Sequence, residues 1–239
     1  MRLRVFHSGK GDCLLLTSTD GKNILIDGGH VNPRNRIDHY SPNVAPFLGQ
    51  MRDNGEKLDL LCVSHFDQDH IGGVLRMLDD EFAWRVFDFQ TSQGLAVEEP
   101  ENSRPPSIDE IWHNSFHELV SKNRRRIADA IAAAAPQSLA LGLDPIGHGT
   151  NFFDGLATSM KESAQLSRRI GASQLGIPLN RTFNNRLVQT RPGQQPTQIG
   201  NFRVTVIGPT GKQLIRLRKK WNAWLRSDKG KRQIREVRN

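Results

Sequence analysis

The chain of 239 residues contains little cysteine and no long hydrophobic run. Its two cysteines, Cys13 and Cys62, lie in apolar strand patterns outside any CxxC pair, so we expect buried thiols instead of a disulfide. The apolar stretch 127–135 is interrupted by Asp129 and is too short to span a bilayer. The N-terminus enters a strand pattern at once, which leaves no room for a signal peptide. These absences predict a protein of the reducing cytoplasm with no membrane partner.

The chain lacks a net positive charge outside its residues 212–239. The formal net charge is +8, yet residues 212–239 alone hold 11 basic and 2 acidic side chains. The remaining residues hold 22 basic and 23 acidic side chains, a balance of −1. The high isoelectric point therefore belongs to the C-terminal segment and is a weak argument for a nucleic-acid substrate elsewhere. A mean hydropathy of −0.53 with 36% hydrophobic residues fits a folded, soluble chain.

The first 90 residues alternate between strand and helix patterns. Apolar residues alternate or run together between turn signals, and the pair Asp20-Gly21 is a strong turn between two strands. This order predicts an α/β layered domain. The expected strands are 2–6, 13–17, 23–26, 58–63 and 84–89, and the expected helices are 44–54 and 74–78.

Residues 91–199 change in character, and we interpret them as a helical insertion with a lid role within a domain that spans 1–209. A strand over 202–207, ended by Gly208-Pro209, closes that domain. Within the insertion, helices are expected at 108–117, 118–135 and 155–170, and irregular chain at 145–153.

The segment 210–239 is predicted to be a basic amphipathic helix followed by a disordered basic tail from residue 227. Leu214, Leu217, Trp221 and Trp224 recur at spacings of 3, 4 and 3, and the opposite face is basic. The favoured interpretation is a surface helix that covers a core. The alternative is a surface for nucleic acid or another acidic partner.

The densest group of metal-binding side chains is His65-Phe66-Asp67-Gln68-Asp69-His70, directly after the apolar run 60–63. Two imidazoles and two carboxylates within six residues suit Zn, Mn or Fe(II). The following Gly72-Gly73 pair lets the backbone fold tightly and opens a helix, whose N-terminus tolerates the anionic groups that a divalent cation attracts. We therefore predict a metal site in this loop.

A second motif is 24–30, in which Asp27 ends a buried strand and is followed by two glycines. Asp27 would act behind the metal ligands, by orienting one or by accepting an imidazole N–H. The other interpretation is an ordinary aspartate at a strand end. The turn 7–13 contains glycines but no helix follows it, so it lacks the spacing of a nucleotide-binding loop, and a hairpin anchored by Asp12 is expected.

Three motifs together resemble the metallo-β-lactamase fold. They are Gly-Lys-Gly-Asp at 9–12, Ile-Leu-Ile-Asp-Gly-Gly at 24–29 and Ser-His-Phe-Asp-Gln-Asp-His-Ile-Gly-Gly at 64–73. The chain looks most like the branch of ComEC-type DNA-internalisation proteins, because Asp67 stands where the commoner HxHxDH loop has its second histidine. The resemblance is strong over 1–80 and returns at 204–209.

The resemblance implies a four-layer αββα sandwich with two divalent ions at the sheet edge, zinc before manganese. His65 and Asp67 would face one ion, and Asp69 and His70 the second, with Asp27 behind them. A bridging water with a lowered pKa would be the nucleophile, and Asp69 would orient it or take its proton. The implied reaction is hydrolysis of a phosphodiester, as in a phosphodiesterase or nuclease.

The chain also departs from that family. Members continue with a Thr-Gly-Asp strand end and a His-His-Gly-Ser loop, which supply further ligands, and nothing in 210–239 matches either. We therefore expect an incomplete sandwich, which is either the first part of a longer protein or completes its site differently. A partner chain is one way to cover its sheet. His148 could reach a metal, and His113 and His117 are expected on a helix surface, so none is assigned as a ligand.

Two functions follow from these patterns. The first is a metal-dependent hydrolase that acts through a metal-activated water. The second is a truncated, catalytically silent domain that binds nucleic acid or a partner through its C-terminal helix.

Overall fold

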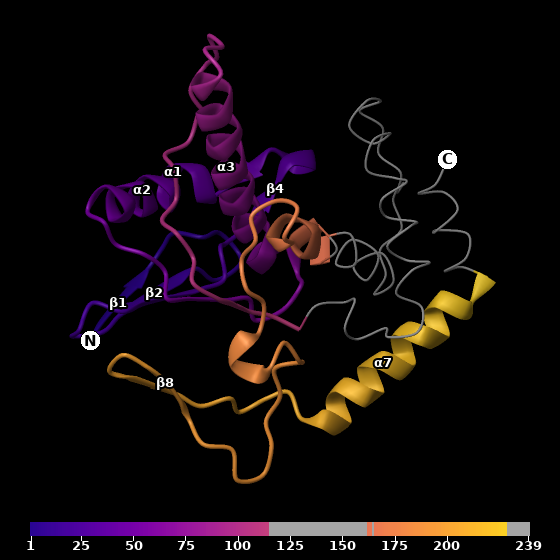
Figure 1. Ribbon diagram of the computed structural model, residues 1–239. Coiled ribbons are helices and arrows are strands. Elements are labelled where there is room, and N and C mark those ends of the chain that lie inside the picture. The colour runs from indigo at the N-terminus through magenta and orange to yellow at the C-terminus, as the bar shows by residue number, and fades with distance from the viewer. Residues whose placement is uncertain (115–161, 164, 229–239) are drawn as a thin grey trace.

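The computed structural model describes residues 1–114, 162–163 and 165–228 (Figure 1). Its largest sheet has five strands. The strand order is β1-β2-β3-β6-β7. Strands β1, β2 and β3 pair antiparallel, whereas β3–β6 and β6–β7 pair parallel. Four of the five strands therefore run in one direction and end at the same edge of the sheet. The bounds are β1 Arg2–Val5, β2 Leu14–Thr17, β3 Asn23–Ile26, β6 Leu60–Cys62 and β7 Ile111–Trp112.

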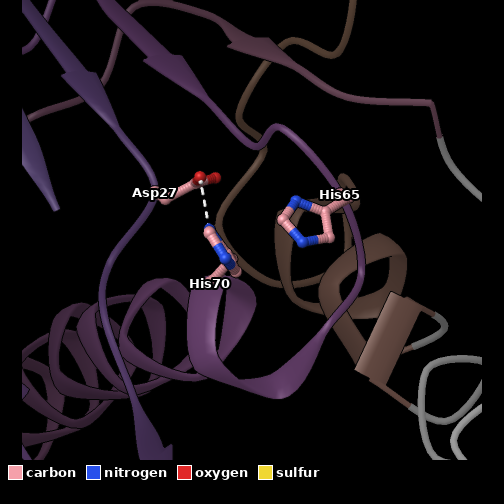
Figure 2. A group of neighbouring side chains, drawn as sticks. All are labelled: Asp27, His65 and His70. Carbon is pink, nitrogen blue, oxygen red and sulfur yellow. Dashed lines mark hydrogen bonds and ion pairs between the residues drawn. The ribbon is translucent and has the colours of Figure 1, made fainter. Parts of the chain in front are cut away.

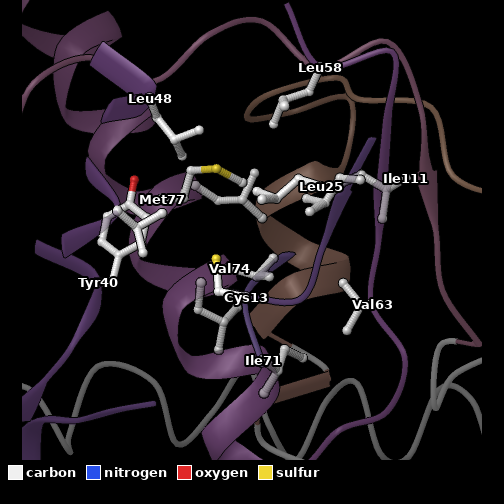
Figure 3. Packing of buried hydrophobic residues seen from close by; sticks show 14 of the residues in the cluster. Cys13, Leu25, Tyr40, Leu48, Leu58, Val63, Ile71, Val74, Met77 and Ile111 are labelled. Atoms are coloured by element: carbon white, nitrogen blue, oxygen red, sulfur yellow. The ribbon is translucent and has the colours of Figure 1, made fainter. Parts of the chain in front are cut away.

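Helices cover one face of this sheet and enclose the main core (Figure 3). Leu25, Leu61 and Ile111 point from the sheet into that core and are almost fully buried. Burying such a side chain contributes about 1.5–3 kcal/mol, so this layer dominates the stability of the sheet. The helices are α1 Tyr40–Asn43, α2 Ala45–Asp53 and α3 Gln68–Ser92, and residues 165–170 are also helical. Between β3 and α1 lie β4 Val31–Asn32, the 3-10 helix Pro33–Asn35 and β5 Ile37–Asp38.

The opposite face of the sheet carries a second, smaller core of Ile24, Leu60 and Trp112. A hairpin of β8 (Thr197–Ile199) and β9 (Phe202–Val204) packs against it, together with residues around the 3-10 helix Arg181–Phe183. Leu3 and Val5 of the edge strand β1 pair with β2 but stay 54% and 68% exposed. The cover on this face therefore does not extend to β1.

Helix α7, Gly211–Arg226, follows the hairpin segment and leads away from the five-stranded sheet (Figure 1). Among the side chains of this helix that the structure describes, Leu214 is buried and Ile215 is 54% exposed. None of the described helices combines the length and the apolar composition that a membrane span requires.

Most elements expected from the sequence are confirmed. The strands at 2–6, 13–17, 23–26 and 58–63 correspond to β1, β2, β3 and β6, and the helices at 44–54 and 212–225 correspond to α2 and α7. The strand at 202–207 is confirmed as β9 over its first three residues, and the helix at 155–170 over its described part.

The strand expected at 84–89 is wrong, because α3 continues through these residues to Ser92. Aromatic and β-branched residues suggested a strand, yet no glycine or proline interrupts the chain between Gly73 and Gly94. Arg85 also pairs with Glu81 one turn earlier, at 2.9 Å. Arg104 further ties the helix to the following loop, through Glu81 at 3.0 Å and Asp88 at 2.6 Å.

The helix expected at 108–117 is also wrong over its described part. Ile111 and Trp112 form β7, which pairs with Leu61 and Cys62 of β6, and Ile108 bridges Leu58. The apolar spacing fitted a helix, but pairing with a distant strand decides the conformation. The predictions for 115–135, 145–153 and 229–239 lie outside the described residues. The domain division stays a prediction, although β7 shows that the main sheet takes residues from the range 91–199.

Candidate metal centre

Polar side chains gather where the four codirectional strands end. His7 follows β1, Asp27 follows β3, the loop 64–70 follows β6, and His113 follows β7. Because the carboxyl ends of parallel strands share one edge, residues far apart in the sequence meet there. This edge holds every motif that the sequence singled out for metal chemistry.

Asp27 is the buried anchor of the site (Figure 2). Its side chain is almost wholly buried, and its backbone adopts a positive φ of 57° between β3 and the two glycines. Three donors surround the carboxylate: Ser64 N–H at 2.8 Å, Ser64 Oγ–H at 2.6 Å and His70 Nδ1 at 2.9 Å. Such bonds compensate for burial of the carboxylate and fix the orientation of the loop that follows β6.

These hydrogen bonds assign the tautomers of both loop histidines. His70 donates its Nδ1–H to Asp27, so its Nε2 carries the free lone pair. Ser64 has one hydrogen, which it gives to Asp27, so its Oγ accepts from His65 Nδ1 at 2.8 Å. In the neutral imidazole of His65, Nε2 is then the nitrogen with the free lone pair. Both imidazoles present the nitrogen that a metal ion needs.

Each histidine also lies near one aspartate. His65 Nε2 is 3.5 Å from Asp67 Oδ2, and His70 Nε2 is 3.9 Å from Asp69 Oδ2. The two imidazole rings are 3.9 Å apart between centroids. The structure thus places His65 near Asp67 and His70 near Asp69, the same two pairs that the resemblance to the metallo-β-lactamase fold implied. Their roles as ligands stay predictions.

Ligand atoms of Asp27, His65 and His70 all lie within 4.8 Å of one another. Imidazole nitrogens and carboxylate oxygens are a donor set that fits Zn²⁺ or Mn²⁺. The oxygens of Asp27 already accept three hydrogen bonds, so we expect it to orient the histidines and leave binding to the loop. Asp67, 68% exposed, and Asp69, 33% exposed, have room to turn toward an ion.

Main-chain contacts hold the loop against the end of β3. Gly28 N–H donates to His70 C=O at 2.9 Å, and Gly73 N–H donates to Gly29 C=O at 3.0 Å. A Cβ on Gly73 would lie 1.8 Å from the Gly28 oxygen, so only glycine fits at this position. The pairs Gly28-Gly29 and Gly72-Gly73 thus allow direct backbone contact between the end of β3 and the start of α3. Asp69 lies in the first turn of α3, where the helix dipole favours a carboxylate.

Comparison with known proteins agrees with this geometry. Residues 9–82 match the metallo-beta-lactamase superfamily model. The match includes β2, β3, β6, the loop 64–70 and the first part of α3. The mixed α/β architecture is consistent with a metallo-β-lactamase fold. No curated protein and no solved structure gave a match.

Neither Ser64 nor His113 was assigned a role in the site from the sequence. Ser64 joins Asp27 to His65, and only the structure shows this because the link depends on side-chain direction. His113 was expected on a helix surface, which is wrong: it is 2% exposed at the end of β7. Its ring stands edge-on to Phe66, with 4.9 Å between centroids. The apolar run before it was the signal for a buried strand end.

Burial gives His113 a measurable effect on stability. It lowers the pKa of His113 from 6.5 to about 4, so the unfolded chain binds a proton there between pH 6.5 and 4 while the folded chain does not. Stability should therefore fall as pH decreases through this window, by about 3 kcal/mol in total. A His113→Leu variant should not lose this stability. Its free energy of unfolding relative to that of wild type should therefore rise by about 3 kcal/mol between pH 7 and pH 4, measured by urea unfolding.

Asp80 supplies a control of opposite sign. Burial raises the pKa of its carboxyl from 3.8 to about 6, so the folded state holds a proton there that the unfolded state has lost. Stability therefore falls as pH rises from about 4 to 6. An Asp80→Asn variant lacks this effect, so its free energy of unfolding relative to that of wild type should be higher at pH 7 than at pH 4. Parallel pH profiles for wild type and His113→Leu would contradict the assignment to His113.

Proposed function

We propose that the chain is a metal-dependent hydrolase of the metallo-β-lactamase superfamily, acting on phosphodiesters as a phosphodiesterase or nuclease. One observation carries this proposal: the hydrogen bonds of Asp27 and Ser64 leave Nε2 free on both His65 and His70, next to two carboxylates. The superfamily match over the same residues supports it. A polar surface loop without a binding function would not require hydrogen bonds that orient both imidazoles.

Each residue of the loop would have a distinct task in that reaction. A divalent cation bound there would lower the pKa of a coordinated water to about 7 and so supply a nucleophile at neutral pH. His65, Asp67, Asp69 and His70 would hold the ion or ions. Asp69, as general base, would accept the proton of the attacking water. Asp27 would keep His70 in the tautomer that binds.

The proposed branch of the superfamily and the proposed metal ions rest on the residue types in the loop 64–70. We assign the loop to the ComEC-like branch because Asp67 replaces a histidine, and we favour two zinc ions over manganese because imidazole nitrogens are present. Cys13 and Cys62 are free, and burial raises the pKa of both thiols to about 12. Such unreactive thiols agree with the cytoplasm proposed as the location, but do not require it.

Metal analysis and a phosphodiesterase assay on the purified full chain test the proposal together. We expect two equivalents of Zn or Mn per chain and cleavage of bis-p-nitrophenyl phosphate or single-stranded DNA. A His65→Ala variant should lose both, whereas Asp53→Asn, at the exposed end of α2, should keep both. Less than one equivalent of metal in the wild type, with no cleavage, would overturn the proposal.

A second candidate function, nucleic-acid binding, is favoured by the surface of α7. The helix has no acidic residue, and Lys212, Arg216, Lys219 and Lys220 are exposed at the spacing of one helical face. A row of cations along a helix matches the charge of a phosphate backbone. In this proposal α7 would hold single-stranded nucleic acid, with or without cleavage at the metal centre.

The salt dependence of DNA binding tests this second function. A variant with Arg216, Lys219 and Lys220 changed to Gln should bind single-stranded DNA more weakly. Its slope of log affinity against log salt should be shallower by about 0.7 for each phosphate that α7 no longer neutralises. The matched control changes three other exposed arginines, Arg181, Arg186 and Arg191, to Gln. Equal affinities for the two variants would remove α7 from nucleic-acid binding.

A further inference from the structure

We propose that His7, His30 and His39 form a phosphate-binding subsite next to the candidate metal centre. It rests on the proposed function, since it would take a second phosphate group of a phosphodiester substrate. The imidazoles come from three separate segments: the turn after β1, the chain after β3 and the chain before α1. None of the three histidines belongs to a hydrophobic core cluster.

The rings of His7 and His30 both lie near the ring of His39. His7 and His39 are 5.1 Å apart between centroids and nearly perpendicular, and His30 and His39 are 6.4 Å apart and nearly parallel. His7 is exposed and the other two are half-buried, so a ligand from solvent can reach them. We call this group the three-histidine cluster.

Main-chain contacts fix the positions of the cluster. His30 N–H donates to Ser8 C=O at 2.9 Å, and His39 N–H donates to His30 C=O at 3.1 Å. Gly9, with a φ of +76°, brings its backbone so close to His39 that a Cβ there would lie 2.5 Å from the ring. Backbone contacts therefore hold the three segments, and with them the three imidazoles, in fixed positions relative to one another.

The same contacts join the cluster to the metal loop. Gly29 N–H donates to Asp12 C=O, and Gly28 N–H donates to His70 C=O, both at 2.9 Å. His30 lies three residues beyond Asp27, so their Cα atoms are at most about 11 Å apart. A substrate bound at the metal centre could therefore reach the cluster with a neighbouring phosphate.

The spacing of the rings favours an anion over a metal ion. Among the described residues, ligand atoms within 4.8 Å of one another occur in the set Asp27, His65 and His70, and the three-histidine cluster does not meet that distance. Imidazoles too far apart to share one ion can still donate N–H bonds to different oxygens of a phosphate.

Charges around the cluster support a phosphate as the ligand. Lys10 lies exposed in the same turn as His7 and adds a cation. Asp38 precedes His39, but its carboxylate accepts bonds from Ser41 N–H at 2.8 Å and Ser41 Oγ–H at 2.7 Å. Asp12 is the acidic residue of the turn that remains exposed, and Lys10 offsets its charge. A substrate with adjacent phosphates, such as an oligonucleotide, fits this arrangement.

Binding of inorganic phosphate tests the cluster without any need for activity. Full-length protein with ¹⁵N-labelled histidine, freed of metal by a chelator, would be titrated with phosphate and followed by NMR. We expect saturable shifts of the His7, His30 and His39 ring signals, assigned by single substitutions, and their loss in His39→Leu. A folded His7→Gln variant, altered at the exposed position, should weaken binding about tenfold. Absence of shifts in the wild-type rings would overturn the subsite.

Kinetics distinguish failure of the subsite from failure of the proposed function. In the metal-loaded protein, we expect kcat/KM for a dinucleotide with a 5′-phosphate to exceed that for the unphosphorylated dinucleotide, and His7→Gln to reduce this ratio about tenfold. Phosphate shifts without any hydrolysis would overturn the proposed function and support the subsite. Hydrolysis with a ratio near one in both proteins would support the function and overturn the subsite.

Discussion

Replacing Asp69 with Asn is expected to lower kcat for phosphodiester hydrolysis by about 10²–10⁴-fold, the range of a lost general base. Asn has almost the same shape but cannot accept the proton of an attacking water. Asp69 lies in the first turn of α3, with Oδ2 3.9 Å from His70 Nε2, and its side chain is 33% exposed. Because it is partly exposed, the free energy of unfolding should change by only about 0.3–1 kcal/mol, the effect of a charge at a helix start.

Metal content, measured beside the steady-state rate, separates catalysis from binding. If Asp69→Asn retains its metal and loses its rate, Asp69 acts on the water; if it loses the metal as well, Asp69 acts first as a ligand. Asp53→Asn is the matched control, because this exposed carboxylate at the end of α2 undergoes the same loss of charge. A kcat within twofold of wild type would exclude a role for Asp69 in the chemical step.

Changing Gly73 to Ala should destabilise the protein by about 3 kcal/mol, the upper part of the range for overpacking. In an exposed helix the same substitution would stabilise by about 1 kcal/mol, because alanine is the better helix former. Here the new Cβ would lie 1.8 Å from the Gly28 oxygen, and both atoms belong to backbone segments that cannot rotate away. Steric overlap therefore reverses the usual sign.

Urea unfolding followed by tryptophan fluorescence measures this effect. Gly208→Ala is a suitable control, since no heavy atom lies within 4 Å of a Cβ at that position. Metal binding should decline together with stability in Gly73→Ala, because displacement of α3 also displaces His70. A variant as stable as wild type would show that the strand end and the helix start can separate without loss.

The sequence predicted the sheet edge well because each of its features is local. Apolar runs that end in Asp27 or in Ser64-His65 mark strand ends, and glycine pairs after them mark tight turns. The pairing of His65 with Asp67 and of His70 with Asp69 came from the resemblance to the metallo-β-lactamase fold. Residues 1–80 were therefore largely predictable, as were the α/β class and the position of α2.

Features that depend on distant partners were not predictable. The part of α3 around Trp84 is held by later residues: Trp84 Nε1–H donates to Asn102 C=O at 2.9 Å, and Arg104 pairs with Glu81 and Asp88. His113 is buried because β7 pairs with β6, some fifty residues earlier in the chain. The tautomers of His65 and His70 depend on Ser64 and Asp27, whose side-chain directions appear only in three dimensions. Sequence periodicity carries no information about such contacts.

The support of the metal loop is made almost entirely of backbone and of the buried Asp27, whereas Asp67 is 68% exposed. For Asp67, a proposed ligand, position and identity are therefore separate properties. Exchange of Asp67 for His would give the commoner HxHxDH arrangement without disturbing any main-chain contact described above. Preference for one metal ion over another could thus change in evolution, or be changed by design, at a single surface residue while the fold stays the same.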